Sequence, residues 1–197
     1  MDIKQIINTQ LKSNTYVLLD SNYNYCWLVD IGDYKRIIRA IPTGMEIRGV
    51  FLTHTHHDHI YGLNDLLRHS PNICVMTSAF GKNALYDDRM NFSKYYETPF
   101  IFEGSKVEVL EEGNRYELFP ETYLDVHETP GHCPSCLTYV VDDYIFTGDA
   151  YIPGEKVVTK LRGGDKLLAK ESIDRIKELC AGKYICPGHG KITMEKM

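Results

Sequence analysis

Four histidines and one aspartate stand within six residues of this chain, in the run His54-Thr55-His56-His57-Asp58-His59. The run follows residues 50–53, whose β-branched and aromatic side chains predict a strand. On extended backbone, residues two apart point to the same side, so His54 and His56 can bind one metal ion. Asp58 and His59 begin a helical pattern and can turn towards a second ion. Zinc prefers imidazole nitrogen and carboxylate oxygen as ligands, and iron and manganese also accept them.

This density of imidazoles favours a metal site over ordinary packing. A single histidine beside an apolar strand is usually just packed or exposed. Four together repel one another and lose hydration when buried, which is costly without a metal or another functional reason. Strand alternation turns His57 away from its neighbours, so we expect a structural or supporting role for that residue.

Short apolar runs and helical patterns must position the cluster. Runs bounded by Gly, Asn, Asp or Pro predict strands at residues 15–19, 26–31, 50–53, 73–76, 107–110, 123–127, 137–141 and 145–146. Helical spacing predicts helices at residues 34–41, 60–69, 79–86 and 166–180. The pair Asp142-Asp143 predicts a hairpin turn between two of the strands. Strands and helices mix throughout, which predicts an α/β fold.

Length and composition narrow the class of protein. A chain of 197 residues, 43% apolar and 25% charged, predicts one domain over residues 1–197. It has no apolar run long enough to span a membrane and no secretory signal at its start, so we expect a cytoplasmic protein with reduced cysteines. The net charge of −5, with scattered basic residues, disfavours nucleic acid as a partner. We therefore expect a small-molecule substrate; a homo-oligomer is left open.

Three later motifs join the histidine run to form a known pattern. The run matches the HxHxDH signature of the metallo-β-lactamase superfamily. Residues 129–132 (TPGH) resemble the loop of its third histidine, and residues 146–149 (FTGD) the strand end of its bridging aspartate. Residues 186–190 (CPGHG) resemble its terminal histidine loop. With four motifs in the family's order, the chain resembles this superfamily over most of its length.

The resemblance implies a fold and a ligand set. The fold is a four-layer αββα sandwich, with two mixed sheets face to face and the metals at one edge. By resemblance, the first metal is held by His54, His56 and His132, and the second by Asp58, His59 and His189, with Asp149 bridging. The pair of divalent ions, zinc by expectation with iron or manganese as alternatives, lowers the pKa of a shared water. Asp58 is also the candidate catalytic residue that accepts a proton.

Residues 88–93 and 161–165 resemble segments of glyoxalase II-like members of the superfamily. This implies hydrolysis of a small ester, thioester, lactone or phosphoester. The sequence departs from glyoxalase II at Val158, where those enzymes carry an arginine for glutathione. We also expect no helical C-terminal domain after His189.

Other activities on the same fold are weighed against this one. A mononuclear iron persulfide dioxygenase would use His54, His132 and Asp149, the two-histidine, one-carboxylate set of oxygen-activating iron. Flavodiiron relatives carry glutamate at the position of His56, and true lactamases often carry cysteine at that of Asp149. A nuclease would need a clamp domain or basic arm. A non-catalytic metal scaffold is disfavoured by the complete ligand set.

The substrate residues are less defined. Tyr95 and Tyr96 lie in the irregular segment 80–102, where they either line the substrate entrance or tie the loop to the core. Lys160 and Arg162 either bind an anionic group of the substrate or are solvated charges. For the Cys133-x-x-Cys136 pair we favour packed small residues over a redox or metal-binding role.

Overall fold

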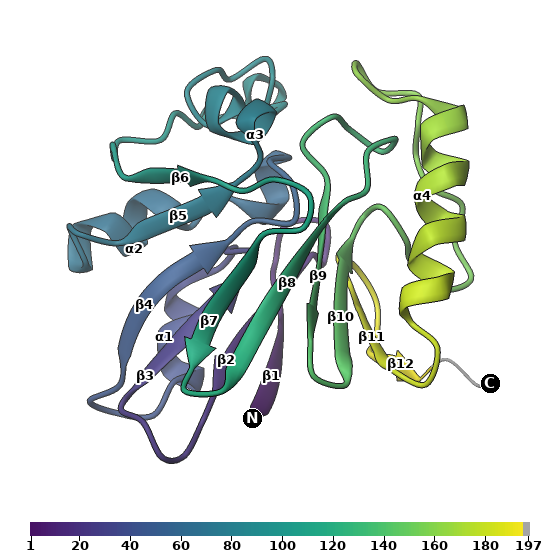
Figure 1. The fold of residues 1–197 in the computed structure, drawn as a ribbon. Coiled ribbons are helices and arrows are strands. Elements are labelled where there is room, and N and C mark those ends of the chain that lie inside the picture. Colours follow the sequence, from purple (N-terminus) through teal and green to yellow (C-terminus); the bar gives the residue numbers. More distant parts are fainter. Residues whose placement is uncertain (195–197) are drawn as a thin grey trace.

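The computed structural model describes residues 1–194, and residues 195–197 of the predicted domain lie outside the described residues. Two six-stranded sheets form its centre (Figure 1). The first has the order β1 (Asp2–Ile7), β2 (Asn14–Leu19), β3 (Tyr25–Val29), β4 (Glu46–Phe51), β5 (Cys74–Thr77) and β6 (Val107–Val109). The second has the order β12 (Thr193–Met194), β11 (Tyr184–Pro187), β10 (Tyr144–Gly148), β9 (Leu137–Val141), β8 (Thr122–Glu128) and β7 (Arg115–Phe119).

Both sheets are mixed. In the first, β1, β2 and β3 pair antiparallel and the strands from β3 to β6 pair parallel. In the second, the pairing is antiparallel except between β10 and β11. Parallel strands bring the carboxyl ends of β4 and β5 to the same edge of the first sheet.

Side-chain alternation along the strands separates the core into layers. All six residues of β2 are buried. Tyr16 and Leu18 point between the two sheets, whereas Val17 and Leu19 point to the opposite face, as expected for period-two alternation. Phe51 of β4 and Tyr139 of β9 meet edge to face between the sheets, with ring centroids 5.6 Å apart. This central layer is therefore built from both sheets.

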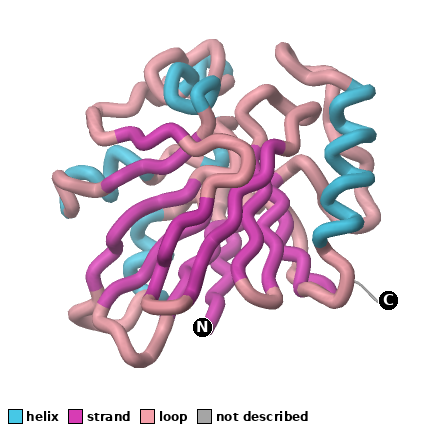
Figure 2. The backbone as a smooth tube through the Cα atoms, in the orientation of Figure 1, coloured by secondary structure: helices cyan, strands magenta, loops and turns pink. Residues whose placement is uncertain are grey.

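Helices cover the two outer faces (Figures 1 and 2). Helices α1 (Tyr34–Ala40) and α2 (Leu63–His69) pack Ile37 and Leu66 against the first sheet, while α3 (Ala79–Ala84) follows β5. Helix α4 (Lys166–Leu179) packs Ile176 against Ile145 and Ile185 of the second sheet. The predicted αββα sandwich is thus confirmed. No helix among residues 1–194 is both long and apolar enough to cross a membrane.

The predicted strands and helices are present with shifted ends, and four strands were missed. The predicted helix 60–69 is present as the shorter α2, Leu63–His69, and a 3-10 turn, His57–His59, precedes it. The predicted hairpin is confirmed: β9 and β10 pair antiparallel, with Asp142 at a φ of 48° in the turn. The missed strands are β1, β7, β11 and β12. In β1 and β7 polar residues face solvent, so neither offers an apolar run to recognise.

Truncation of the layer between the sheets is expected to lower the free energy of unfolding. Leu124 of β8 is fully buried in that layer, so Leu124→Ala should cost about 2–5 kcal/mol. Denaturant titration measures this cost. The control is Leu167→Ala, because Leu167 is 66% exposed and should change stability by less than about 0.5 kcal/mol. Equal effects of the two variants would contradict the layer assignment.

Candidate metal centre

The segment that carries the histidine run is hydrogen-bonded at its start to both sheets. Beyond the end of β4, Thr53 donates its backbone N–H to Asp30 Oδ1 and its hydroxyl to Asp30 Oδ2, both at 2.7 Å. The backbone N–H of Leu137, on β9, donates to the carbonyl of Thr53 at 2.7 Å. The chain leaving this point is therefore fixed from both sides, and His54 is fully buried.

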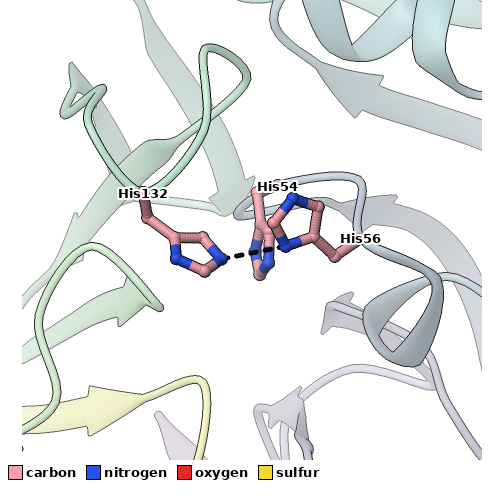
Figure 3. Close-up of side chains that lie close together, drawn as sticks. All are labelled: His54, His56 and His132. Carbon is pink, nitrogen blue, oxygen red and sulfur yellow. Dashed lines mark hydrogen bonds between the residues drawn. The ribbon is translucent and has the colours of Figure 1, made fainter. Parts of the chain in front are cut away.

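Three histidines from two distant segments converge at this edge. His54 and His56 come from the segment after β4, and His132 from the loop between β8 and β9 (Figure 3). His132 Nε2 lies 2.9 Å from His56 Nδ1, and the His54 ring centroid lies 4.7 Å and 5.1 Å from those of His56 and His132. One ligand atom of each histidine lies within 4.8 Å of the others.

A second group lies beside the first. Asp58 Oδ2 is 3.4 Å from His59 Nε2 and 3.3 Å from His189 Nε2. His189 follows β11, so this group also joins segments far apart in the chain. Asp149, directly after β10, contacts both groups, with Oδ2 3.6 Å from His132 Nε2 and 3.4 Å from His189 Nε2. The structure therefore brings all seven predicted ligands together; that they bind metal stays a prediction.

Hydrogen bonds through Nδ1 orient three of these rings. His59 Nδ1 donates to Asp30 Oδ2 at 2.9 Å, His132 Nδ1 to the carbonyl of Val158 at 2.8 Å, and His189 Nδ1 to the carbonyl of Leu11 at 3.1 Å. With Nδ1 engaged in this way, Nε2 is left to face the centre. This is the arrangement by which proteins fix the tautomer of metal-binding histidines.

Unpaired polar atoms test whether the residues suit a metal. Within the described residues, His54 Nε2, His56 Nε2 and Asp149 Oδ1 are buried and make no hydrogen bond. Burying such atoms without a partner is costly, and each can donate an electron pair to a cation. Nitrogen and carboxylate donors in this ratio match the ligands of zinc and iron sites. The residues present therefore fit metal ions.

Without metal, the first group of histidines and the second group, around Asp58, differ in the protonation of their imidazoles. Burial, together with repulsion from neighbouring imidazoles, holds the pKa of His54 well below its usual value, and burial also lowers the pKa of His132. Burial alone would lower the pKa of His59, but Asp58, Asp149 and Asp30 raise it to about 9. For His189, Asp149 and Asp58 likewise overcome burial and raise the pKa to about 10.

The sequence analysis missed Asp30, which supports the second group. Its side chain is buried and accepts hydrogen bonds from Thr53 and His59. The available signal was a carboxylate directly after the apolar strand 26–29, followed by Ile31-Gly32. A charged side chain at that place, with no partner nearby in the sequence, indicates a buried tertiary contact.

A second missed feature is the close approach of Gly188 to the centre. A Cβ at position 188 would overlap Asp149 Oδ1 and lie 3.0 Å from His59 Cε1. Only glycine therefore fits between β11 and the carboxylate of Asp149.

A cavity of about 470 Å³ opens over the cluster. Tyr95, Tyr96 and His57 line it, and a role of the two tyrosines in binding substrate stays a prediction. Lys160 and Arg162 do not line it, and Lys156 is there instead. In the loop after β10, the bond from His132 to the Val158 carbonyl holds that segment beside the cavity. Further along the loop Leu161 lines the cavity, whereas its neighbours Lys160 and Arg162 do not.

The cysteine pair lies beneath the loop of His132. Cys133 and Cys136 are buried free thiols, with their sulfur atoms 3.3 Å apart. Both belong to the apolar cluster under α4, with Ile145 and Ile176. This environment agrees with the predicted packing role.

Comparisons with known proteins agree with this geometry. The family model of the metallo-beta-lactamase superfamily matches residues 8–189. A hydroxyacylglutathione hydrolase of Hahella chejuensis is 30% identical over 176 residues, covering 87% of this chain and 59% of the relative. The crystal structure of the B3 metallo-beta-lactamase BLEG-1 superposes with a TM-score of 0.88 at 26% identity, covering 98% of this chain and 93% of that one. ETHE1 from Myxococcus xanthus gives a TM-score of 0.75 at 20% identity, covering 98% and 79%, a likeness of fold alone.

The chain belongs to the metallo-beta-lactamase superfamily. It spans 59% of the length of the Hahella hydroxyacylglutathione hydrolase. The glyoxalase II-like resemblance seen in the sequence is therefore confirmed at the level of relatives, while the substrate of this chain is a separate question.

Loss of the Asp30 carboxylate is expected to weaken metal binding. Asp30→Asn removes the negative charge beside His59 and leaves one acceptor oxygen for the three donors that Thr53 and His59 present; such supporting partners typically contribute 10–100-fold in metal affinity. Competition with a chromogenic chelator measures the affinity. Asp33→Asn is the matched control, because the printed partners of the Asp33 carboxylate, which include Thr9 and Arg36, are not predicted metal ligands. Equal affinity in the two variants would refute the role of Asp30.

Metal uptake should release protons at neutral pH. Free imidazole has a pKa of about 6.5, whereas His59 and His189 in the metal-free protein have raised values of about 9 and about 10. Both rings must lose a proton to bind metal, so about two protons per chain should appear at pH 7.5 in weakly buffered solution.

The same shifts set the pH dependence of the metal-free protein. A pKa raised by folding stabilises the folded state fully below about pH 6.5, and this contribution is lost as pH rises through the folded pKa values. The free energy of unfolding of the metal-free chain should therefore fall between about pH 7 and pH 10. A rise over that window would contradict the charge assignment.

Proposed function

We propose that this protein is a hydrolase that binds two divalent metal ions and cleaves a small ester, thioester, lactone or phosphoester. The observation that carries the proposal is the position of the cluster at the base of an open cavity. Five of the seven predicted ligands line that cavity, namely His56, Asp58, His132, Asp149 and His189. A substrate entering it would meet the proposed metal ligands directly.

His54, His56 and His132 would hold one ion, and Asp58, His59 and His189 the other, with Asp149 shared between them. Bound ions would supply an acidic water and polarise the oxygen of the scissile group. The chain's own residues define the rest. Asp58 lines the cavity, and its proposed role is to accept a proton from the attacking water. Apolar residues of the surrounding loops line the same space.

The named relatives support an acyl substrate. The Hahella relative is a hydroxyacylglutathione hydrolase, so a thioester is the first substrate class to test. The similarity to BLEG-1, which extends over 93% of that chain, adds β-lactam amides to the same panel. Zinc is the expected metal from the ligand types, and iron and manganese suit the same donors.

An iron persulfide dioxygenase is the alternative, supported by the fold likeness to ETHE1. It would need only His54, His132 and Asp149. The second group of Asp58, His59 and His189, assembled within 4.8 Å, has no purpose in that reading and favours the two-metal hydrolase. Elemental analysis of protein purified without added metal separates the two: about two metals per chain supports the hydrolase, whereas one iron with oxygen uptake on persulfides supports the dioxygenase.

Removal of the carboxylate of Asp149 or of Asp58 should abolish most hydrolysis, for two different reasons. Asp149→Ala should reduce bound metal, because it removes a donor shared by both groups. Asp58→Ala should lower kcat/KM by about 10²–10⁴-fold, the range for loss of a general base, in addition to any loss of metal. Asp143→Ala is the control, since Asp143 is exposed in the β9–β10 turn. Unchanged hydrolysis in both site variants would overturn the mechanism.

A further inference from the structure

Two apolar residues at the cavity have backbone conformations that such residues rarely adopt. Leu11 has a φ of 49° and Phe92 a φ of 62°, both in the left-handed region. Bulky side chains avoid this region, and residues held there tend to cluster at functional sites. Both residues line the cavity over the cluster.

The backbone of Leu11 contacts His189, while its side chain lines the cavity. Its carbonyl accepts the hydrogen bond from His189 Nδ1 at 3.1 Å. Its side chain remains 67% exposed at the cavity, without burial that would reward an apolar residue. A packing role does not account for leucine at this position, whereas contact with an apolar ligand does.

Phe92 is fixed by a buried polar clamp on either side. The Asn91 side chain donates to the carbonyls of Ala84 and Phe100, at 3.0 and 3.1 Å. The Ser93 hydroxyl donates to the Phe100 carbonyl and accepts from the Phe100 backbone N–H, the latter at 2.8 Å. Asn91 and Ser93 are both fully buried, so both neighbours of Phe92 are tied to the core. The clamp holds the Phe92 ring against His56, with centroids 4.9 Å apart and planes at 88°.

Other exposed apolar side chains gather at the same cavity. Tyr95, Val158 and Leu161 all line it, and each is exposed. Lys156 is the one lysine or arginine of the described residues that lines it, and Glu155 stands beside it. An apolar wall with few charges indicates a ligand whose buried part is also apolar.

We infer that Leu11 and Phe92 are the residues that bind the acyl chain, and that the substrate is an ester, thioester or lactone with an apolar acyl chain of several carbons. This inference rests on the proposed hydrolase function. A glutathione thioester fits the wall poorly, because its two carboxylates would face a single lysine. The cavity of about 470 Å³ has room for a chain of this size beside the reacting group.

The test is a chain-length series with a constant neutral leaving group. Acetyl, butyryl and hexanoyl thioesters of N-acetylcysteamine are compared with S-lactoylglutathione on the metal-loaded protein. We expect kcat/KM to rise about threefold for each added methylene, as for burial of apolar surface. Leu11→Asn and Phe92→Asn keep a residue that tolerates the left-handed conformation but remove the apolar surface. Each should lower the hexanoyl-to-acetyl ratio of kcat/KM by about fivefold, in proportion to the one or two methylenes that it contacts.

The hexanoyl-to-acetyl ratio is measured within one variant, so a general loss of folded protein or of bound metal lowers both rates equally and leaves the ratio unchanged. Leu167→Asn is the matched control. Leu167 and Leu11 are equally exposed, at 66% and 67%, but Leu167 lies on α4 and does not line the cavity. Its ratio should equal that of the unmodified protein. A flat series, a ratio unaffected by both cavity variants, or a preference for S-lactoylglutathione would overturn the inference and leave the hydrolase intact.

Absence of hydrolysis on the whole panel would instead overturn the proposed function. The acyl pocket is then judged by isothermal titration calorimetry with hexanamide against acetamide. Tighter binding of hexanamide, weakened in Leu11→Asn but not in Leu167→Asn, would support the pocket. Equal binding of the two amides would overturn it.

Discussion

The carboxylate of Asp30 is the contact on which the site depends. It lies buried where β3 ends, in a left-handed conformation with a φ of 57°, and its backbone N–H donates to the carbonyl of Phe51 at the end of β4. One oxygen accepts from the Thr53 backbone, and the other accepts from the Thr53 hydroxyl and from His59. Burial raises the pKa of this carboxyl, and its hydrogen bonds oppose that rise. One side chain thus joins two strand ends to a candidate metal ligand.

The electrostatics of the centre follow from how its members are buried. His54 and His132 stay neutral because imidazolium would lose its hydration among like neighbours. His59 and His189 carry protons in the metal-free protein because three carboxylates face them. Cations entering the site would replace those protons. The same carboxylates would then face positive charge both with and without metal. Metal binding and protonation are therefore linked, which ties the stability of the protein to both.

Chemistry and selectivity come from different parts of the molecule. The proposed ligands lie on short segments directly after strands, where the two sheets hold them rigidly. The cavity walls come from loops: residues 9–13, the segment around Phe92, and the segment after β10. Loops can change without disturbing the strands, so similar ligand sets occur beside different cavities. This is why the names of relatives restrict the reaction more than they restrict the substrate.

The sequence by itself determined the set of candidate ligands, the α/β class and, through its motifs, the family. Ligand types and their spacing are local properties, and apolar runs such as those of β2 and β9 reveal their strands without reference to the rest of the chain. Tertiary structure decided which strands pair, that Asp30 supports His59, and that Lys156 rather than Lys160 or Arg162 reaches the cavity. It also decided that Leu11 stands beside His189, 178 residues away. Such contacts arise from the packing of distant segments, and no periodicity or local propensity in the chain encodes them.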